Sequence, residues 1–194
     1  MALAINTADA FWGHSRPFLE RVGRDITTAH ERAIRDVGGM VASATNLAFS
    51  IEMYLKALRV LSGIAVIASH DLWALYKTLP LHMKTSIESR YSSLGSVPQN
   101  DVHTLELQVS IGPFCENQEA GGGSNNPGIR EGNSLESVMK RNKDVFQTWR
   151  YIYERGTVGK ICEFRYEFYF LDNVAKVLRS EAVSTINKLR HNQK

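Results

Sequence analysis

The stretch from about residue 39 to residue 61 constrains the fold of this chain more than any other feature. Apolar residues recur there every three or four positions, which places them on one face of an α-helix. Glu52 and Lys56 lie between them, four positions apart with the acid first, an arrangement that stabilises a helix. Burial of aliphatic surface is worth roughly 25 cal/mol per Å², so this helix is predicted to be central to the core. The apolar face comprises Val41, Ala44, Leu47, Ala48, Ile51, Tyr54, Leu55, Leu58 and Leu61.

The same periodicity, with turn and capping residues between segments, extends over most of the chain. Pro17 is expected to kink the first helix or to begin a new one near Ser15, because proline lacks a backbone N–H. The apolar run at 64–69 has no evident partner strand and is taken as a connector or a helix extension. We therefore predict an all-α domain, with further helices over about 7–35, 69–79, 81–93, 134–153 and 161–189.

A change of composition marks an insertion at about 95–133. Glycine and proline cluster there, and the tract GGGSNNPG is typical of a flexible loop. Within it, Leu105, Leu107, Val109 and Ile111 alternate with polar residues, which predicts one short strand or one arm of a hairpin. The chain is thus expected to be a single domain over 1–194 that carries this long Gly-rich insertion.

Composition narrows the functional classes. Apolar residues make up 43% of the chain, enough for a core, and the formal net charge is only +3, which permits contact with nucleic acid without arguing for it. Cys115 and Cys162 match no metal spacing or disulfide framework, which favours a reducing cytoplasm. No apolar run approaches the roughly 20 residues of a membrane span, and the N-terminus does not resemble a signal peptide.

No motif for a metal or a cofactor is present in the sequence. The six histidines are scattered, HExxH and CxxC patterns are absent, and GGGSNNPG lacks the Lys-Ser/Thr ending of a phosphate-binding loop. We therefore expect no metal site and no cofactor.

Three patches, in this order, resemble HEPN-domain proteins. NLAFSIEMYLKAL at 46–58 is similar to the second-helix signature of that family, and SHDLWALYKTLP at 69–80 is similar to the His-Asp-Leu opening of its next helix. WRYIYE at 149–154 follows the insertion and precedes a C-terminal helix, as the family pattern requires. The resemblance covers about 40–93 and 134–190 and implies an up-and-down bundle of four or five helices, commonly a homodimer.

The resemblance also implies functions. Many members cleave RNA without a metal ion, with an Arg followed after four to six residues by a His, at a site formed where two such motifs meet in a dimer. Other members bind nucleotides or partner proteins and lack the motif. Members are often paired with a nucleotidyltransferase or act in toxin–antitoxin, antiviral or CRISPR-associated systems.

The Arg–His pattern fits this chain incompletely. Arg150 is in the best place by analogy, but Arg155, Gly156 and Thr157 stand where the His should be, and Arg150 can instead pair with Glu154. A literal match runs from Arg24 to His30, yet it lies in the first predicted helix, and the chain has enough Arg and His for one match to arise by chance.

His70 and Asp71 form the other polar site of interest. Asp71 or Ser69 can simply cap the following helix, and His70 can bond to a neighbouring helix. The alternative is a functional site, with His70, Arg150 and Glu154 as catalytic residues and Glu52, Lys56 and Asp71 as ligand-binding residues. For such a site Glu52, Lys56, His70, Arg150 and Glu154 should line one cleft.

The sequence therefore favours a HEPN-like dimeric helical protein of a bacterial defence or toxin–antitoxin type system that binds or cleaves RNA. If it is an enzyme, the expected activity is that of a metal-independent endoribonuclease. The rival interpretations are a non-catalytic module that recognises a partner protein, such as an antitoxin or a nucleotidyltransferase, or a nucleotide, and an unrelated helical bundle with a coincidental likeness.

Overall fold

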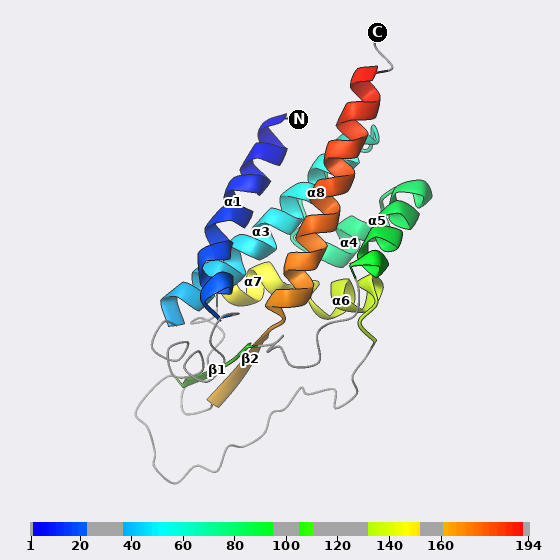
Figure 1. The fold of residues 1–194 in the computed structure, drawn as a ribbon. Coiled ribbons are helices and arrows are strands. Elements are labelled where there is room, and N and C mark those ends of the chain that lie inside the picture. The colour runs from blue at the N-terminus through cyan, green and yellow to red at the C-terminus, as the bar shows by residue number, and fades with distance from the viewer. Residues whose placement is uncertain (1, 23–36, 95–104, 111–131, 152–160, 192–194) are drawn as a thin grey trace.

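The computed structural model of the chain describes residues 2–22, 37–94, 105–110, 132–151 and 161–191. Within these ranges most residues are helical, which confirms the helical class (Figure 1). The helices are α1 (Ala2–Val22), α3 (Val37–Leu61), α4 (Leu72–Lys77), α5 (Leu81–Ser93), α6 (Leu135–Arg141), α7 (Val145–Arg150) and α8 (Phe168–His191), and the strands are β1 (Leu105–Ser110) and β2 (Ile161–Tyr166).

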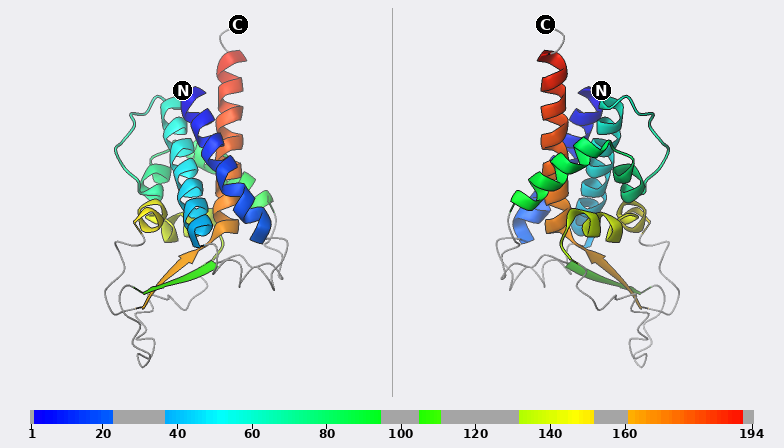
Figure 2. Two further views of the ribbon diagram at one scale, coloured as in Figure 1. Left: turned by 90° about the vertical axis from the view of Figure 1, so that its left-hand side faces the viewer. Right: turned by 90° about the vertical axis from the view of Figure 1, so that its right-hand side faces the viewer.

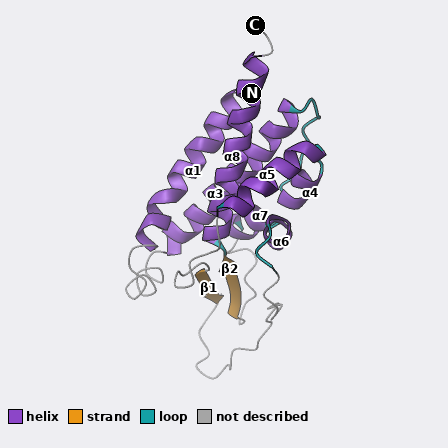
Figure 3. Ribbon diagram, turned by 45° about the vertical axis from the view of Figure 1, so that its right-hand side comes forward, coloured by secondary structure: helices purple, strands orange, loops and turns teal. Residues whose placement is uncertain are grey.

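Helix α3 is the centre of the core, as its apolar face predicts. It contacts α1, α4, α7 and α8, and Leu47, Ile51 and Leu55 on it are fully buried. The three long helices α1, α3 and α8 run side by side, with α1 opposite in direction to the other two (Figures 1 and 2). Helices α4 and α5 pack against α3 and α8, on the side away from α1 (Figure 1). Helices α6 and α7 lie toward the end that carries the strands (Figure 3).

Of the two alternatives expected at Pro17, the start of a new helix is wrong. Helix α1 continues through Pro17, and no new helix begins at Ser15. The Ser15 hydroxyl donates to the Trp12 carbonyl at 2.8 Å inside the helix, and the Ser15 carbonyl accepts from Ser43 of α3 at 3.1 Å. Proline removes only one backbone donor, and packing along α3 stabilises the rest of the helix. The remainder of the predicted helix, 23–36, lies outside the described residues.

The single helix predicted over 134–153 is wrong, because the chain forms two helices with a break at Asn142. Ser134 caps α6 by accepting from the N–H of Ser137, as an N-cap should. The buried Asn142 amide donates to the Val138 carbonyl at 3.0 Å and to Glu167 at 2.7 Å. A side chain that bonds in this way competes with the helical backbone, and the direction of the chain changes there.

The predicted start of the last helix is also wrong. Ile161–Tyr166 forms β2, which pairs antiparallel with β1 so that Leu105 lies opposite Tyr166 and Ser110 opposite Ile161. The segment ICEFRY is rich in strand-forming residues, and its partner comes from the insertion more than 50 positions earlier. Helix α8 starts only at Phe168.

The elements between α3 and α6 follow the sequence closely. Residues 64–69 are a connector without regular structure, and α4 ends before Pro80. Met83 and Ile87 are the buried residues of α5. None of the helices in the described ranges has the combination of length and apolar character needed to cross a membrane.

Candidate functional site

A buried carboxylate on α3 is the centre of the candidate site. The Glu52 side chain is 1% exposed, and each of its oxygens has a different partner. Lys56, one turn later on α3, donates from Nζ to Oε1 at 2.6 Å. His70, on the connector before α4, places Nδ1 2.9 Å from Oε2. A buried charge is strongly unfavourable without such partners, so the bonds to Lys56 and His70 offset the free-energy cost of burying the Glu52 carboxylate.

The bond to Glu52 fixes the chemistry of the imidazole. An ionised carboxylate only accepts hydrogen bonds, so a bond to ionised Glu52 requires a proton on Nδ1 of His70 and leaves Nε2 as the other ring nitrogen. The His70 side chain is 44% exposed, whereas its carboxylate partner is buried. The ring is therefore held at a defined orientation with one edge accessible, which is the arrangement that an acid–base group requires.

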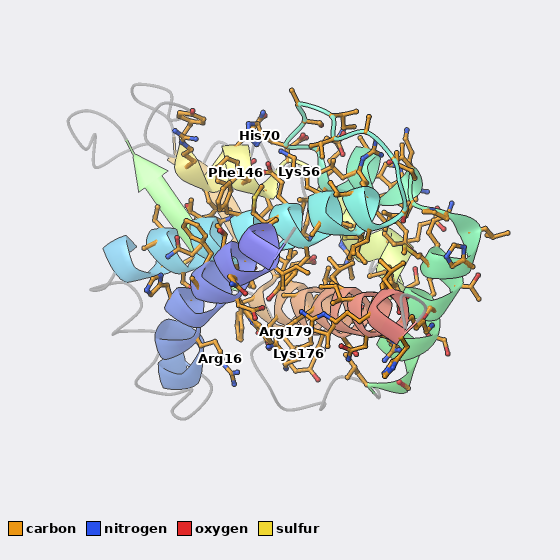
Figure 4. All side chains as sticks on the ribbon, turned by 90° about the horizontal axis from the view of Figure 1, so that it is seen from above. Arg16, Lys56, His70, Phe146, Lys176 and Arg179 are labelled. Carbon is orange, nitrogen blue, oxygen red and sulfur yellow. The ribbon has the colours of Figure 1, made fainter. Side chains whose placement is uncertain are left out.

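Phe146 on α7 connects this group to Arg150. The His70 ring lies 5.0 Å from the Phe146 ring, centroid to centroid, with 31° between the planes. The Arg150 guanidinium carbon lies 5.6 Å from the same ring centroid, one helical turn further along α7. The Arg150 guanidinium also contacts the ring of Tyr151 at 5.2 Å. Figure 4 shows His70, Phe146 and Lys56 together on one side of α3.

Of the five residues proposed for one site, three form one hydrogen-bonded group, and Arg150 lies on a ring next to it. Lys56 and His70 each bond to Glu52, and Arg150 packs on the Phe146 ring that also contacts His70. Glu154, Arg24 and His30 lie outside the described residues, so neither the Arg150–Glu154 pair nor the Arg24–His30 motif has a described geometry.

Phe146 is the member of the site that the sequence did not single out. Its periodicity indicates only a core position, and it is indeed 5% exposed. The available sign was its place four residues before Arg150, which puts the two side chains on one helix face.

Asp71, which the sequence grouped with the ligand-binding residues, has a structural role. Its carboxylate accepts from the backbone N–H of Ala74 at 2.7 Å and caps α4. Its own N–H donates to the Ser69 hydroxyl at 3.1 Å. The cap fixes where the chain enters α4, and therefore positions the adjacent His70.

A second polar cluster lies on the other side of the bundle. Trp12 of α1 donates from Nε1 to Asp172 of α8 at 2.8 Å, and Lys176 pairs with that carboxylate at 2.7 Å. The guanidinium groups of Arg16 and Arg179 lie 5.5 and 5.9 Å from the Trp12 ring centroid. Figure 4 shows these cations well apart from His70. The Trp12–Asp172 and Arg179–Asp9 bonds join α1 to α8 and are structural contacts.

Among the described residues, no group of three or more His, Cys, Asp or Glu side chains is arranged to hold a metal ion. Comparison of the chain with models of protein families, with curated proteins and with solved structures finds no match.

Proposed function

We propose that the chain is a HEPN-like helical protein of a bacterial defence or toxin–antitoxin type system that binds RNA as a dimer and cleaves it without a metal ion. The observation that carries the proposal is the bond between His70 Nδ1 and the buried Glu52, together with the Phe146 ring that both His70 and Arg150 contact. The Arg–His motif of the family is incomplete after Arg150, and the imidazole of His70, from the connector before α4, packs on the same Phe146 ring as Arg150.

Each residue has a distinct role in the proposed reaction. His70 Nε2 removes the proton from a ribose 2′-hydroxyl, whose oxygen forms a bond to the adjacent phosphorus. Arg150 and Lys56 stabilise the negative charge that builds on the phosphate oxygens. The bond between phosphorus and the 5′-oxygen breaks, and the 5′-oxygen receives the proton that His70 took. The products are a 2′,3′-cyclic phosphate and a free 5′-hydroxyl, and Glu52 acts only by positioning His70.

Incubation of the purified chain with tRNA and with unstructured RNA in EDTA tests the proposal. Cleavage should persist in EDTA and should fall roughly 10²–10⁴-fold in His70→Ala, as expected for loss of an acid–base group. The matched control is His82→Ala, because His82 is an exposed histidine on α5 and its removal should change nothing. Arg150→Ala should lose on the order of 10²-fold, and the control Arg190→Ala, at the exposed end of α8, should not.

The results also separate the alternatives. Absence of cleavage by the wild-type chain, with RNA still bound, would replace the enzyme by a non-catalytic RNA-binding module. Cleavage that is lost in Arg24→Ala or His30→Ala but kept in His70→Ala would place the site at the other motif. A Glu52→Gln variant should retain RNA affinity while its pH–rate profile shifts, because it changes the orientation and charge environment of His70 and leaves Arg150 and Lys56 in place.

A further inference from the structure

The apolar face of α8 continues past the point where the bundle ends. Up to Ala182 this face is fully buried, with Leu178 and Ala182 both 0% exposed. The same stripe then passes through Ile186, which is partly buried against the core, to Leu189, which is 40% exposed. Beside it, Val183 is 38% exposed. The periodicity that predicts an inward position for Leu189 is thus unbroken, but the other described helices do not reach far enough to bury this residue.

Leu189 is exposed because this part of α8 lies outside the bundle. The C-terminal end of α8 projects beyond α1, α3 and α5 (Figures 1 and 2). Residues 183–191 account for roughly 13 Å of helix at 1.5 Å per residue. An apolar stripe on a free helix of this kind is the usual site where an amphipathic partner helix packs.

The charges beside the apolar stripe indicate which kind of partner would bind there. Lys188, Arg190 and His191 occupy the last turn of α8 and are exposed. The last acidic residue of the chain is Glu181, which is buried and bonded to Ser86 at 2.6 Å. The projecting end is therefore purely basic, and a partner with acidic residues around an apolar face complements it.

We propose that the projecting end of α8, residues 183–191, is a docking surface for an acidic amphipathic helix of a partner protein. Leu189, Ile186 and Val183 supply the apolar contact, and Lys188 and Arg190 supply the charges that select an acidic partner. A second copy of the chain fits poorly, because the overlap of roughly 13 Å brings the same positive charges together in either orientation. RNA fits poorly too, because its phosphates leave the apolar stripe uncovered.

Binding of a designed peptide to the full chain tests the proposal. The probe is a synthetic amphipathic helix with leucine on one face and glutamate on the other, followed by fluorescence anisotropy. The controls are a scrambled peptide and a peptide with lysine in place of glutamate. The acidic peptide should bind at least about tenfold more tightly than either control, and its affinity should fall as salt is added.

Variants locate the contact. Leu189→Glu should weaken binding of the acidic peptide by about tenfold or more, and Lys188→Glu with Arg190→Glu should reverse the preference toward the lysine peptide. The matched control is Leu81→Glu, because Leu81 is 75% exposed but lies on α5. Circular dichroism of each variant should match the wild-type chain, because the altered side chains are exposed.

Three results would overturn the proposal. The first is equal binding of the acidic and scrambled peptides, or binding that Leu189→Glu leaves unchanged. The second is a wild-type dimer in sedimentation velocity that becomes a monomer in Leu189→Glu, because a second copy would then cover the stripe. The third is loss of RNA binding in the Lys188→Glu, Arg190→Glu chain without any preference for the acidic peptide.

Discussion

Arg179 of α8 binds Asp9 of α1 through two nitrogens, with Nε 2.9 Å from Oδ1 and Nη2 3.2 Å from Oδ2. The same Asp9 carboxylate accepts a hydrogen bond from the hydroxyl of Tyr54 on α3. Asp9 is therefore the point at which the three long helices meet through polar groups. Tyr54 is fully buried, whereas the side chains of Arg179 and Asp9 are 44% and 33% exposed, so the two contacts of Asp9 should differ in their contribution to stability.

The buried contact should matter more than the exposed one. Tyr54→Phe is expected to lower the free energy of unfolding by about 1 kcal/mol, because it removes a hydrogen bond from a buried hydroxyl. Arg179→Ala should cost less than about 1 kcal/mol, because solvent screens a half-exposed ion pair. Urea unfolding of both variants and of Asp9→Asn measures the differences. Strict additivity of Tyr54→Phe and Asp9→Asn would contradict the shared contact.

Alkaline conditions should destabilise the fold through its buried tyrosines. Burial, followed by the hydrogen bond to Asp9, raises the pKa of Tyr54, and burial with the hydrogen bond to Glu88 raises the pKa of Tyr76. Burial raises the pKa of Tyr91 to about 12. The unfolded chain releases these protons near pH 10, so the stabilisation is fully present below that pH and is lost as pH rises from there.

The free energy of unfolding should therefore fall between about pH 10 and pH 12. Urea titrations at several alkaline pH values measure the slope. Tyr91→Phe should show a shallower fall than the wild-type chain, because it has one titrating phenol fewer. An identical slope in the two chains would exclude Tyr91 as a source of the effect.

The contribution of the α4 N-cap to the free energy of unfolding should be measurable by itself. Asp71→Ala is expected to lower the free energy of unfolding by about 1 kcal/mol, because the N–H of Ala74 loses its acceptor. Asp71→Asn should stay close to the wild-type value, since asparagine also caps well. Ser134→Ala, which removes the cap of α6, provides an independent comparison, and the two losses should add. A loss in Asp71→Asn equal to that in Asp71→Ala would show that the carboxylate charge, not the cap, is what stabilises the fold.

The sequence predicted the elements whose structure depends on local periodicity. The stripe from Val41 to Leu61 gave the central helix, and Asp71 and Pro80 gave the limits of α4. Features that depend on partners far away in the sequence could not be predicted. The break at Asn142 needs the Glu167 carboxylate, and β2 needs β1, which no pattern within residues 161–166 reveals.

In the candidate site, too, only the contact between residues close in sequence could be predicted. Glu52 and Lys56 are an i, i+4 pair, so their contact could be predicted from spacing alone. The contact of His70 with Glu52 depends on the path of the connector after α3. Arg59 holds that connector by donating to the Ala65 carbonyl at 3.1 Å and by bonding to Thr78. The link to Arg150 depends on how α7 packs against α3, which places Phe146 beside His70.

The charges at Glu52 should show a compensation between two variants. Lys56→Met keeps the aliphatic part of the side chain but removes the ammonium group, and leaves a 1% exposed carboxylate with one partner fewer. The expected loss is on the order of 1–3 kcal/mol, the cost of an unsatisfied buried polar group. Addition of Glu52→Gln to Lys56→Met should recover much of that loss, because the uncompensated charge is then gone. Urea unfolding of the two single variants and the double variant measures the coupling.

The matched control is the exposed pair of Glu136 and Lys140 on α6, with side chains 55% and 52% exposed, where Lys140→Met should cost less than about 0.5 kcal/mol. A double variant less stable than Lys56→Met would show that the carboxylate stabilises the fold through His70 alone.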